Sequence, residues 1–276
     1  MSKIVSIHSF RRGTGKSNLA ANLVALLAQT GKRVGVIDAD FQFPGLHILF
    51  GLDKEKTDRT LNDYLWGQCT IEEAAYDVSR GGVTPPLLRM EKGQVAIWAT
   101  TQDRPNLSGG IYLVPSSVKP GDIARILREG YDVNLLLEGL RELIRHLNLD
   151  YVFIDTHPGL NQETLLSMAA SDILIVILCL DRQDYQGTAV MVDVAKKLEA
   201  PRVYLVVNQV LPVFDAAAVR QQIEKTCGAP VARVLPFSED MLRLGSAGIF
   251  CLRYPDQPWT QAVRQITTQI VTGEIS

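Results

Sequence analysis

The stretch Ser9-Phe-Arg-Arg-Gly-Thr-Gly-Lys-Ser17 decides the fold of this chain of 276 residues. The residues before it, Lys3 to Ser9, predict a buried strand, and Lys16 to Gln29 after it place leucines on one stripe of a helix. The backbone amides of a glycine-containing turn between a strand and a helix can surround phosphate oxygens, together with the helix N-terminus. The sequence therefore predicts phosphate binding here, and a glycine-rich turn without a ligand is the alternative.

Apolar runs and apolar residues at helical spacing alternate along the rest of the chain. The predicted strands are Lys3–Ser9, Arg33–Ile37, Ile111–Pro115, Tyr151–Ile154, Ile173–Leu180, Val203–Val207 and Val231–Leu235. The predicted helices are Lys16–Gln29, Val133–Leu147, Tyr185–Leu198, Ala216–Cys227, Glu239–Ser246 and Gln261–Ile270. This alternation predicts an α/β fold with a doubly wound, mostly parallel sheet and helices on both faces.

The length suits one large α/β domain better than two, so residues 1–276 are predicted to form a single domain. Residues 41–107 are an irregular excursion within it, rich in glycine, proline and polar residues. We expect short helices there at Leu61–Trp66 and Ile71–Tyr76, and a strand at Val95–Ala99.

Composition disfavours several classes of protein. Apolar residues make up 46% and charged residues 21%, and the net charge of −2 gives no overall field that would attract nucleic acid. The four cysteines form no C-x-x-C pair, which argues against a zinc site, a shared iron–sulfur site and a secreted disulfide framework. The start lacks a signal peptide, and the apolar run Ile173 to Leu180 is far shorter than the ~20 residues that span a bilayer. We expect a cytoplasmic protein.

Acidic residues follow two of the predicted strands. Asp38 and Asp40 come after Arg33–Ile37, and Asp155 comes after Tyr151–Ile154. Ligands of such sheets bind beyond the carboxyl ends of the strands, so these carboxylates are expected to converge near the phosphate loop. Phosphoryl transfer to water requires an acceptor for the nucleophile, and carboxylates bind Mg²⁺. Solvated loop carboxylates are the alternative.

The loop departs from the standard Walker A pattern, G-x-x-x-x-G-K-[ST], because position 10 is Phe. It resembles the deviant form of the MinD/ParA family, K-G-G-x-G-K-[ST], at its second half. Ile37-Asp-Ala-Asp40 resembles the D-x-D of the family's switch I, and Tyr151 to Gly159 resembles its Walker B and switch II. The resemblance extends from residue 3 to about 255, and its best-matching motifs lie outside residues 41–107.

The resemblance implies that ATP and Mg²⁺ are the cofactors. Lys16 would reach the β- and γ-phosphates, Ser17 would ligate Mg²⁺, and Asp155 would hold the ion through water. Asp40 would orient the attacking water, and Asp38 would support Ser17 and the ion from outside the coordination sphere. Further residues expected to contact the nucleotide are Arg12, Gly13, Thr14, Gly15, Asn18 and Gly159. We expect no catalytic base at His157, because ATPases of this type do not need one.

Two arginines depart from the family's loop. Arg11 stands where the signature lysine stands, and Arg12 replaces a glycine. In the family this lysine reaches across a nucleotide-sandwich dimer to the partner's phosphates. An arginine can bind phosphate through a bidentate pair of hydrogen bonds. Arg11 is therefore expected to act in catalysis with Lys16 and Asp40. Neutralisation of the phosphates within one chain is the alternative, as is transfer of the cross-dimer role to another basic residue.

Two segments resemble the parts of the family that surround the base. Val206-Val-Asn208-Gln follows a strand, and Asn208 would read adenine through its amide, unless it is a structural turn residue. Leu235-Pro236-Phe237-Ser resembles the MinD-type loop that borders the base largely with backbone.

The absence of paired cysteines and of a basic amphipathic C-terminal helix favours a ParA-like branch over iron–sulfur carriers and membrane-bound MinD. The resemblance implies a homodimer when ATP is bound, an adaptor that stimulates slow hydrolysis, and cargo that is positioned on the nucleoid. The departure at position 11 favours the carboxysome-positioning branch, McdA, with its adaptor McdB. The alternatives are a nucleotide-binding regulator or scaffold with little turnover and a Min-type division-site ATPase.

Non-specific DNA binding is a further expectation of a ParA-like branch, and it would be sensitive to salt. The candidate residues are Arg220, Arg233, Arg243, Arg253 and Arg264. Their alternative role is that of ordinary solvated surface residues.

Overall fold

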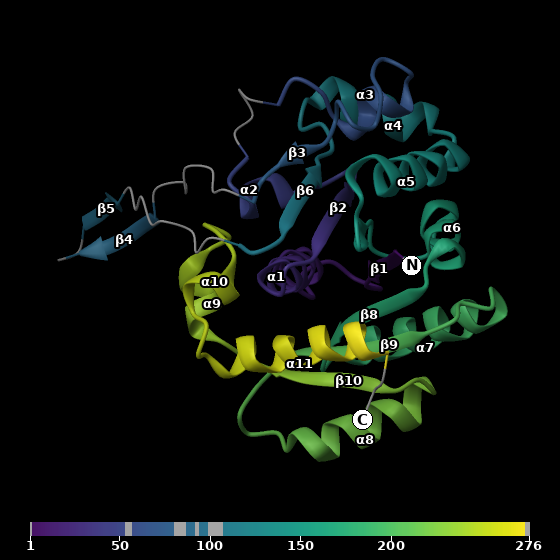
Figure 1. Cartoon of the computed structure of the whole chain (residues 1–276). Helices are drawn as coiled ribbons and strands as arrows, with labels where there is room; N and C mark the ends of the chain where they lie inside the picture. The colour runs from purple at the N-terminus through teal and green to yellow at the C-terminus, as the bar shows by residue number, and fades with distance from the viewer. Residues whose placement is uncertain (1, 53–56, 80–86, 92–93, 99–106, 274–276) are drawn as a thin grey trace.

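The computed structural model describes residues 2–52, 57–79, 87–91, 94–98 and 107–273. Its centre is an eight-stranded sheet with the strand order β10-β9-β8-β1-β7-β2-β6-β3 (Figure 1). The strands are β1 (Lys3–His8), β2 (Arg33–Ala39), β3 (Tyr76–Asp77), β6 (Gly110–Val114), β7 (Tyr151–Thr156), β8 (Ile173–Cys179), β9 (Val203–Val210) and β10 (Val231–Pro236). Neighbouring strands are parallel except for β3 against β6. The predicted fold class is confirmed.

Helices cover both faces of this sheet. One face packs against α1 (Lys16–Gln29) and α11 (Pro258–Thr272), and the other against α5 (Val133–Leu147), α6 (Gln162–Ala170), α7 (Arg182–Lys197) and α8 (Ala216–Cys227). Successive residues of a strand point to opposite faces. Along β7, Phe153 packs on the α1 side, whereas Val152 and Ile154 pack on the α5 side. The central strands are buried on both faces, which explains their continuous apolar runs.

Several elements of the excursion differ from expectation. The structure has α2 (Leu46–Leu49), α3 (Leu61–Leu65), β4 (Leu87–Glu91) and β5 (Gln94–Trp98). The helix expected at Ile71–Tyr76 is wrong, because residues 71–74 form turns and Tyr76 begins β3. The side chains of Thr70 and Glu73 bond to each other's backbone amides, which closes this turn locally. The strand expected at Val95–Ala99 corresponds to β5, and Ala99 lies outside the described residues.

The remaining helices are α4 (Pro120–Glu129), α9 (Glu239–Leu244) and α10 (Phe250–Arg253). No helix within the described ranges is long and apolar enough to cross a membrane.

Strand order places the acidic residues beside the phosphate loop. β7 lies between β1 and β2, and its Asp155 is the register partner of Ile7 on one side and of Asp38 on the other. The loop after β1 therefore opens at the same sheet edge as both carboxylates, as the parallel arrangement predicts.

Candidate functional site

The loop between β1 and α1 has the backbone of a phosphate cradle. Gly13 and Gly15 have φ angles of 81° and 93°, in the left-handed region that glycine enters at no steric cost. Gly15 is the N-cap of α1, and it offers no side chain to the first amides of the helix, so those amides can bind an anion. A pocket of about 310 Å³ opens over the loop. It is lined by Ser9, Arg11, Arg12, Gly13, Thr14, Gly15, Lys16, Ser17, Asn18, Asp40, Phe43 and Pro158.

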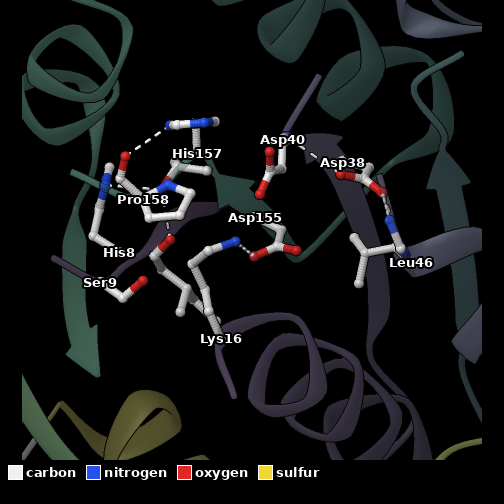
Figure 2. A network of polar contacts seen from close by, with 12 residues as sticks. His8, Ser9, Lys16, Asp38, Asp40, Leu46, Asp155, His157 and Pro158 are labelled. Atoms are coloured by element: carbon white, nitrogen blue, oxygen red, sulfur yellow. Dashed lines mark hydrogen bonds and ion pairs between the residues drawn. The ribbon is translucent and has the colours of Figure 1, made fainter. Parts of the chain in front are cut away.

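Lys16 and Asp155 form a buried ion pair at the floor of this pocket. The distance from Lys16 Nζ to Asp155 Oδ1 is 2.6 Å, and the side chains are 6% and 1% exposed (Figure 2). Burial makes each charge dependent on the other, because a lone charge there would be strongly unfavourable. The pair holds the lysine at the cradle. Phosphate oxygens can there replace the carboxylate as the partner of the lysine, or bind the lysine together with it.

The second oxygen of Asp155 fits the outer sphere of a metal ion. Asp155 Oδ2 is buried and has no hydrogen-bond partner among the described residues, and a buried acceptor without a donor is costly. Mg²⁺ keeps several waters, which are donors of this kind, and Ser17 lines the same pocket. The described residues contain no group of three or more His, Cys, Asp or Glu that could hold an ion. Asp155 Oδ2 and the Ser17 hydroxyl fit an Mg²⁺ ion whose other ligands are water and substrate phosphates.

Asp38 anchors the segment that follows β2. Its Oδ2 accepts hydrogen bonds from the amides of Gly45 and Leu46, at 2.9 and 3.0 Å, at the start of α2. Burial, and then the negative charge of Asp155, raise the pKa of Asp38 to about 7. Its contacts are thus to the switch I backbone, while its position beside Asp155 keeps it near the expected metal site.

Asp40 reaches the pocket itself. The side chain lines the pocket wall and is 7% exposed. Its Oδ1 accepts the amide of Phe43 at 3.2 Å, and burial raises its pKa. A carboxylate at this place can accept a proton or a hydrogen bond from a water molecule at the end of the phosphate chain.

Arg12 connects the phosphate loop with both neighbouring loops. Its Nη2 donates to Gln42 Oε1 at 3.0 Å and lies 3.1 Å from His157 Nε2. Its guanidinium carbon lies 3.4 Å from the ring centroid of Phe43, which is 63% exposed. These three partners were not predicted, because single-residue motifs do not show which loops meet.

Arg11 points to a different element. Its Nε donates to Asp184 Oδ1 at 2.8 Å, and its Nη1 lies 3.2 Å from Gln183 Oε1 and 3.4 Å from Asp181 Oδ1. All three partners belong to α7 or to its N-cap.

The loop after β7 is fastened to the phosphate loop by backbone. The amide of Gly159 donates to the carbonyl of Ser9 at 2.9 Å, so it is already occupied. His157 Nδ1 lies 2.7 Å from the carbonyl of Pro158 (Figure 2). Its contacts to Pro158 and Arg12 join His157 to its own loop and to the phosphate loop.

A buried histidine beneath the cradle was missed by sequence reasoning. His8 Nδ1 lies 2.8 Å from Thr156 Oγ1, and its Nε2 lies 3.3 Å from Ser167 Oγ. Burial, and then the charge of Lys16, lower the pKa of His8 to about 3, so the ring is neutral. A histidine inside an apolar strand was the only available signal.

Asn208 lies under the phosphate loop, and both ends of its amide have partners. Its Nδ2 donates to the carbonyl of Thr14 at 2.8 Å, and its Oδ1 lies 3.3 Å from Trp259 Nε1. The amide of Phe237, which follows Pro236, donates to the carbonyl of Val210 at 2.8 Å, so the β9 and β10 loops are neighbours. Among the described residues, the pocket wall does not include Asn208, Pro236, Phe237 or Gly159.

The late arginines are dispersed over β10 and the helices from α8 to α11. Two of them pair with acidic residues of their own helices. Arg220 lies 3.1 Å from Glu224, and Arg243 lies 3.2 Å from both Glu239 and Asp240. A single basic surface is not evident from these contacts.

Comparisons with known proteins identify the family of this chain. A family model described as AAA domain matches residues 2–203. The chain belongs to this family, in the MinD/ParA group of deviant Walker A ATPases. An uncharacterised ATP-binding protein of Methanocaldococcus jannaschii is 26% identical over 273 residues, which are 98% of this chain and 88% of that protein.

Solved structures share the fold. The septum site-determining protein MinD of Pyrococcus horikoshii, complexed with Mg-ADP, has a TM-score of 0.73 and 20% identity, and the match covers 98% of this chain and 96% of that one. Apo McdA of Cyanothece has a TM-score of 0.70 and 18% identity, with 98% and 100% covered. The resemblance that the sequence motifs indicated is thereby confirmed at the level of family and fold.

Proposed function

We propose that this family member binds ATP with Mg²⁺ and hydrolyses it slowly to ADP and phosphate. The observation that carries this is the buried Lys16–Asp155 pair under a phosphate cradle, with Asp40 at the pocket wall. A cation and oriented amides at the phosphates, with a carboxylate near the attacking water, are what phosphoryl transfer requires.

In this proposal each residue keeps a distinct role. Lys16 and the amides of residues 13–17 bind the β- and γ-phosphates, and Asp40 orients the water for attack. Ser17 and, through water, Asp155 would hold Mg²⁺, which neutralises charge on the phosphate oxygens, while Asp38 fixes the segment beside them. Asn208 and the backbone of Pro236 and Phe237 would border the base.

We further propose that ATP gives a sandwich homodimer that positions or partitions intracellular cargo with an adaptor. The sheet edge that carries the pocket also carries exposed apolar side chains, of which Phe43 is 63%, Phe10 37% and Leu160 36% exposed. Phe43 lines the pocket, and Phe10 and Leu160 lie in the loops after β1 and β7. A second copy placed over this edge would cover such apolar surface. The carboxysome is the first cargo to test, since the fold resembles that of McdA.

Purified protein should release phosphate from ATP only with Mg²⁺, and Lys16→Gln should release none. Asp40→Ala should bind ATP yet release phosphate far more slowly. Wild-type protein that binds no ATP would contradict the enzyme proposal. If wild-type protein binds ATP without turnover, even with an adaptor, it is a nucleotide-binding scaffold.

Retention of the protein on DNA at low salt, only when ATP is present, would support the nucleoid as its matrix.

A further inference from the structure

Arg11 departs from the family pattern and lines the pocket, but its side-chain contacts are to α7 and the N-cap of that helix. Arg11 is 37% exposed, and its described contacts are to Asp181, Gln183 and Asp184. A guanidinium with several directed bonds to one helix start is held in a defined orientation, because its fork geometry is rigid.

The carboxylate that holds Arg11 is itself fixed. Asp184 is 1% exposed, and its second oxygen accepts the amide of Cys179 at 3.1 Å, at the end of β8. Asp181, the N-cap of α7, accepts the amides of Gln183 and Asp184. If Arg11 left this place, it would leave a buried carboxylate without its cation, which is strongly unfavourable.

A second contact joins the same two elements independently. The ring of Phe10 lies directly against Gly187 in α7, so that a Cβ at position 187 would overlap the ring. Glycine inside a helix is otherwise unfavourable compared with alanine. The close approach of the ring gives a physical reason for glycine at this position.

We propose that Arg11 is a positioning residue that fastens the phosphate loop to α7 through Asp184, and not a phosphate ligand for the partner subunit. Phe10 and Gly187 form the second fastening. α7 is then part of the machinery that shapes the cradle, although none of its residues lines the described pocket. This inference rests on the proposed function, because it assigns a role within the same nucleotide site.

The two roles of Arg11 predict different results in a double-mutant cycle. In the positioning role, Arg11→Ala and Asp184→Asn each weaken Mg–ADP binding to the monomer about tenfold. The double variant binds no more weakly than Arg11→Ala alone, because both changes break one contact. In the cross-dimer role, Arg11→Ala leaves ADP affinity unchanged and abolishes only the ATP-dependent dimer, whereas Asp184→Asn has little effect on either.

The experiment is therefore a titration of wild type, both single variants and the double variant with Mg–ADP, together with their masses in ATP–Mg²⁺. Arg182→Ala, an exposed arginine at the same helix start, is the matched control and should bind as wild type does. Gly187→Ala tests the second fastening and should also weaken ADP binding, even if Asp184→Asn fails to fold. Unchanged ADP affinity in both Arg11→Ala and Gly187→Ala would overturn the inference. Nucleotide binding by the wild type would in that case still support the proposed function. A wild type that binds no nucleotide would overturn both.

Discussion

The phosphate end of the site and its proposed base end differ in what their polar groups already contact. At the phosphate end, Asp155 Oδ2 has no partner among the described residues, and the amides at the start of α1 have no side-chain cap. At the base end, the amide of Asn208 bonds to Thr14 and Trp259, and Gln209 bonds to the carbonyl of Gly13 at 3.0 Å. The phosphate end is therefore ready for a ligand, whereas side-chain reading of a base would require existing bonds to break. Affinity should come mainly from the phosphates.

The largest expected effect is at the phosphate end. Lys16→Ala should weaken ATP binding by at least about 100-fold, because it removes the central cation and leaves the buried Asp155 unpaired. Calorimetric titration measures it. Lys32→Ala is a matched control, since Lys32 pairs with Asp150 at partly exposed positions. ATP binding by Lys16→Ala at nearly wild-type affinity would refute a phosphate-dominated site.

The next effect concerns turnover. Asp40→Ala should lower the rate of hydrolysis by roughly 100-fold or more, in the range of a lost acid–base group, while ATP affinity changes little. Single-turnover phosphate release measures the rate. Asp193→Ala, an exposed aspartate on α7, should hydrolyse normally. Equal rates in Asp40→Ala and wild type would remove Asp40 from the reaction.

A substitution at the proposed base end should have a smaller effect, and the effect should be the same for ATP and GTP. Asn208→Ala should lower the free energy of unfolding by about 1–2 kcal/mol, since the buried Trp259 Nε1 loses its acceptor. It should weaken ATP and GTP binding by similar factors, because it acts through the loop. Parallel titrations with both nucleotides decide the question. A selective loss of ATP affinity would show that Asn208 reads adenine and that the two ends are more alike than their contacts indicate.

The last effect is on stability below the phosphate end, and it is seen only as the solution is acidified. The pKa of His8 is lowered from 6.5 to about 3, so the folded protein binds fewer protons than the unfolded chain between these values. The stability contribution of neutral His8 is complete above pH 6.5 and is lost as the pH falls toward 3. His8→Gln should therefore show a shallower fall in the free energy of unfolding from pH 6.5 to 4, measured by denaturant titration. Identical slopes would mean that His8 is not neutral and buried as described.

Long periodic segments and linear motifs could be predicted from the sequence. The bounds of α1, α5 and α8 agree with the apolar spacing, which is strong over three or four turns. The helices α4 and α6 were not predicted. Short elements depend on tertiary contacts and on capping, as at Asn161, which forms a capping box with Thr164 at the start of α6.

The residues of the site likewise divide into those that the sequence predicts and those that it does not. Motif spacing placed Lys16, Asp40 and Asp155, because each follows a strand whose end could be recognised. The contacts between Arg11 and Asp184 and between Phe10 and Gly187 join residues more than 170 positions apart. No local pattern encodes such pairs, so an arginine in place of a lysine could not reveal its partner before the fold was known.

Light scattering tests the central claim most directly. The mass of wild-type and Asp40→Ala protein is measured with ATP–Mg²⁺, with ADP and without nucleotide. The account predicts the monomer mass without nucleotide and with ADP, twice that mass with ATP–Mg²⁺, and a longer-lived dimer for Asp40→Ala. A mass that is the same under all three conditions would contradict it and would leave a nucleotide pocket without a dimerisation switch.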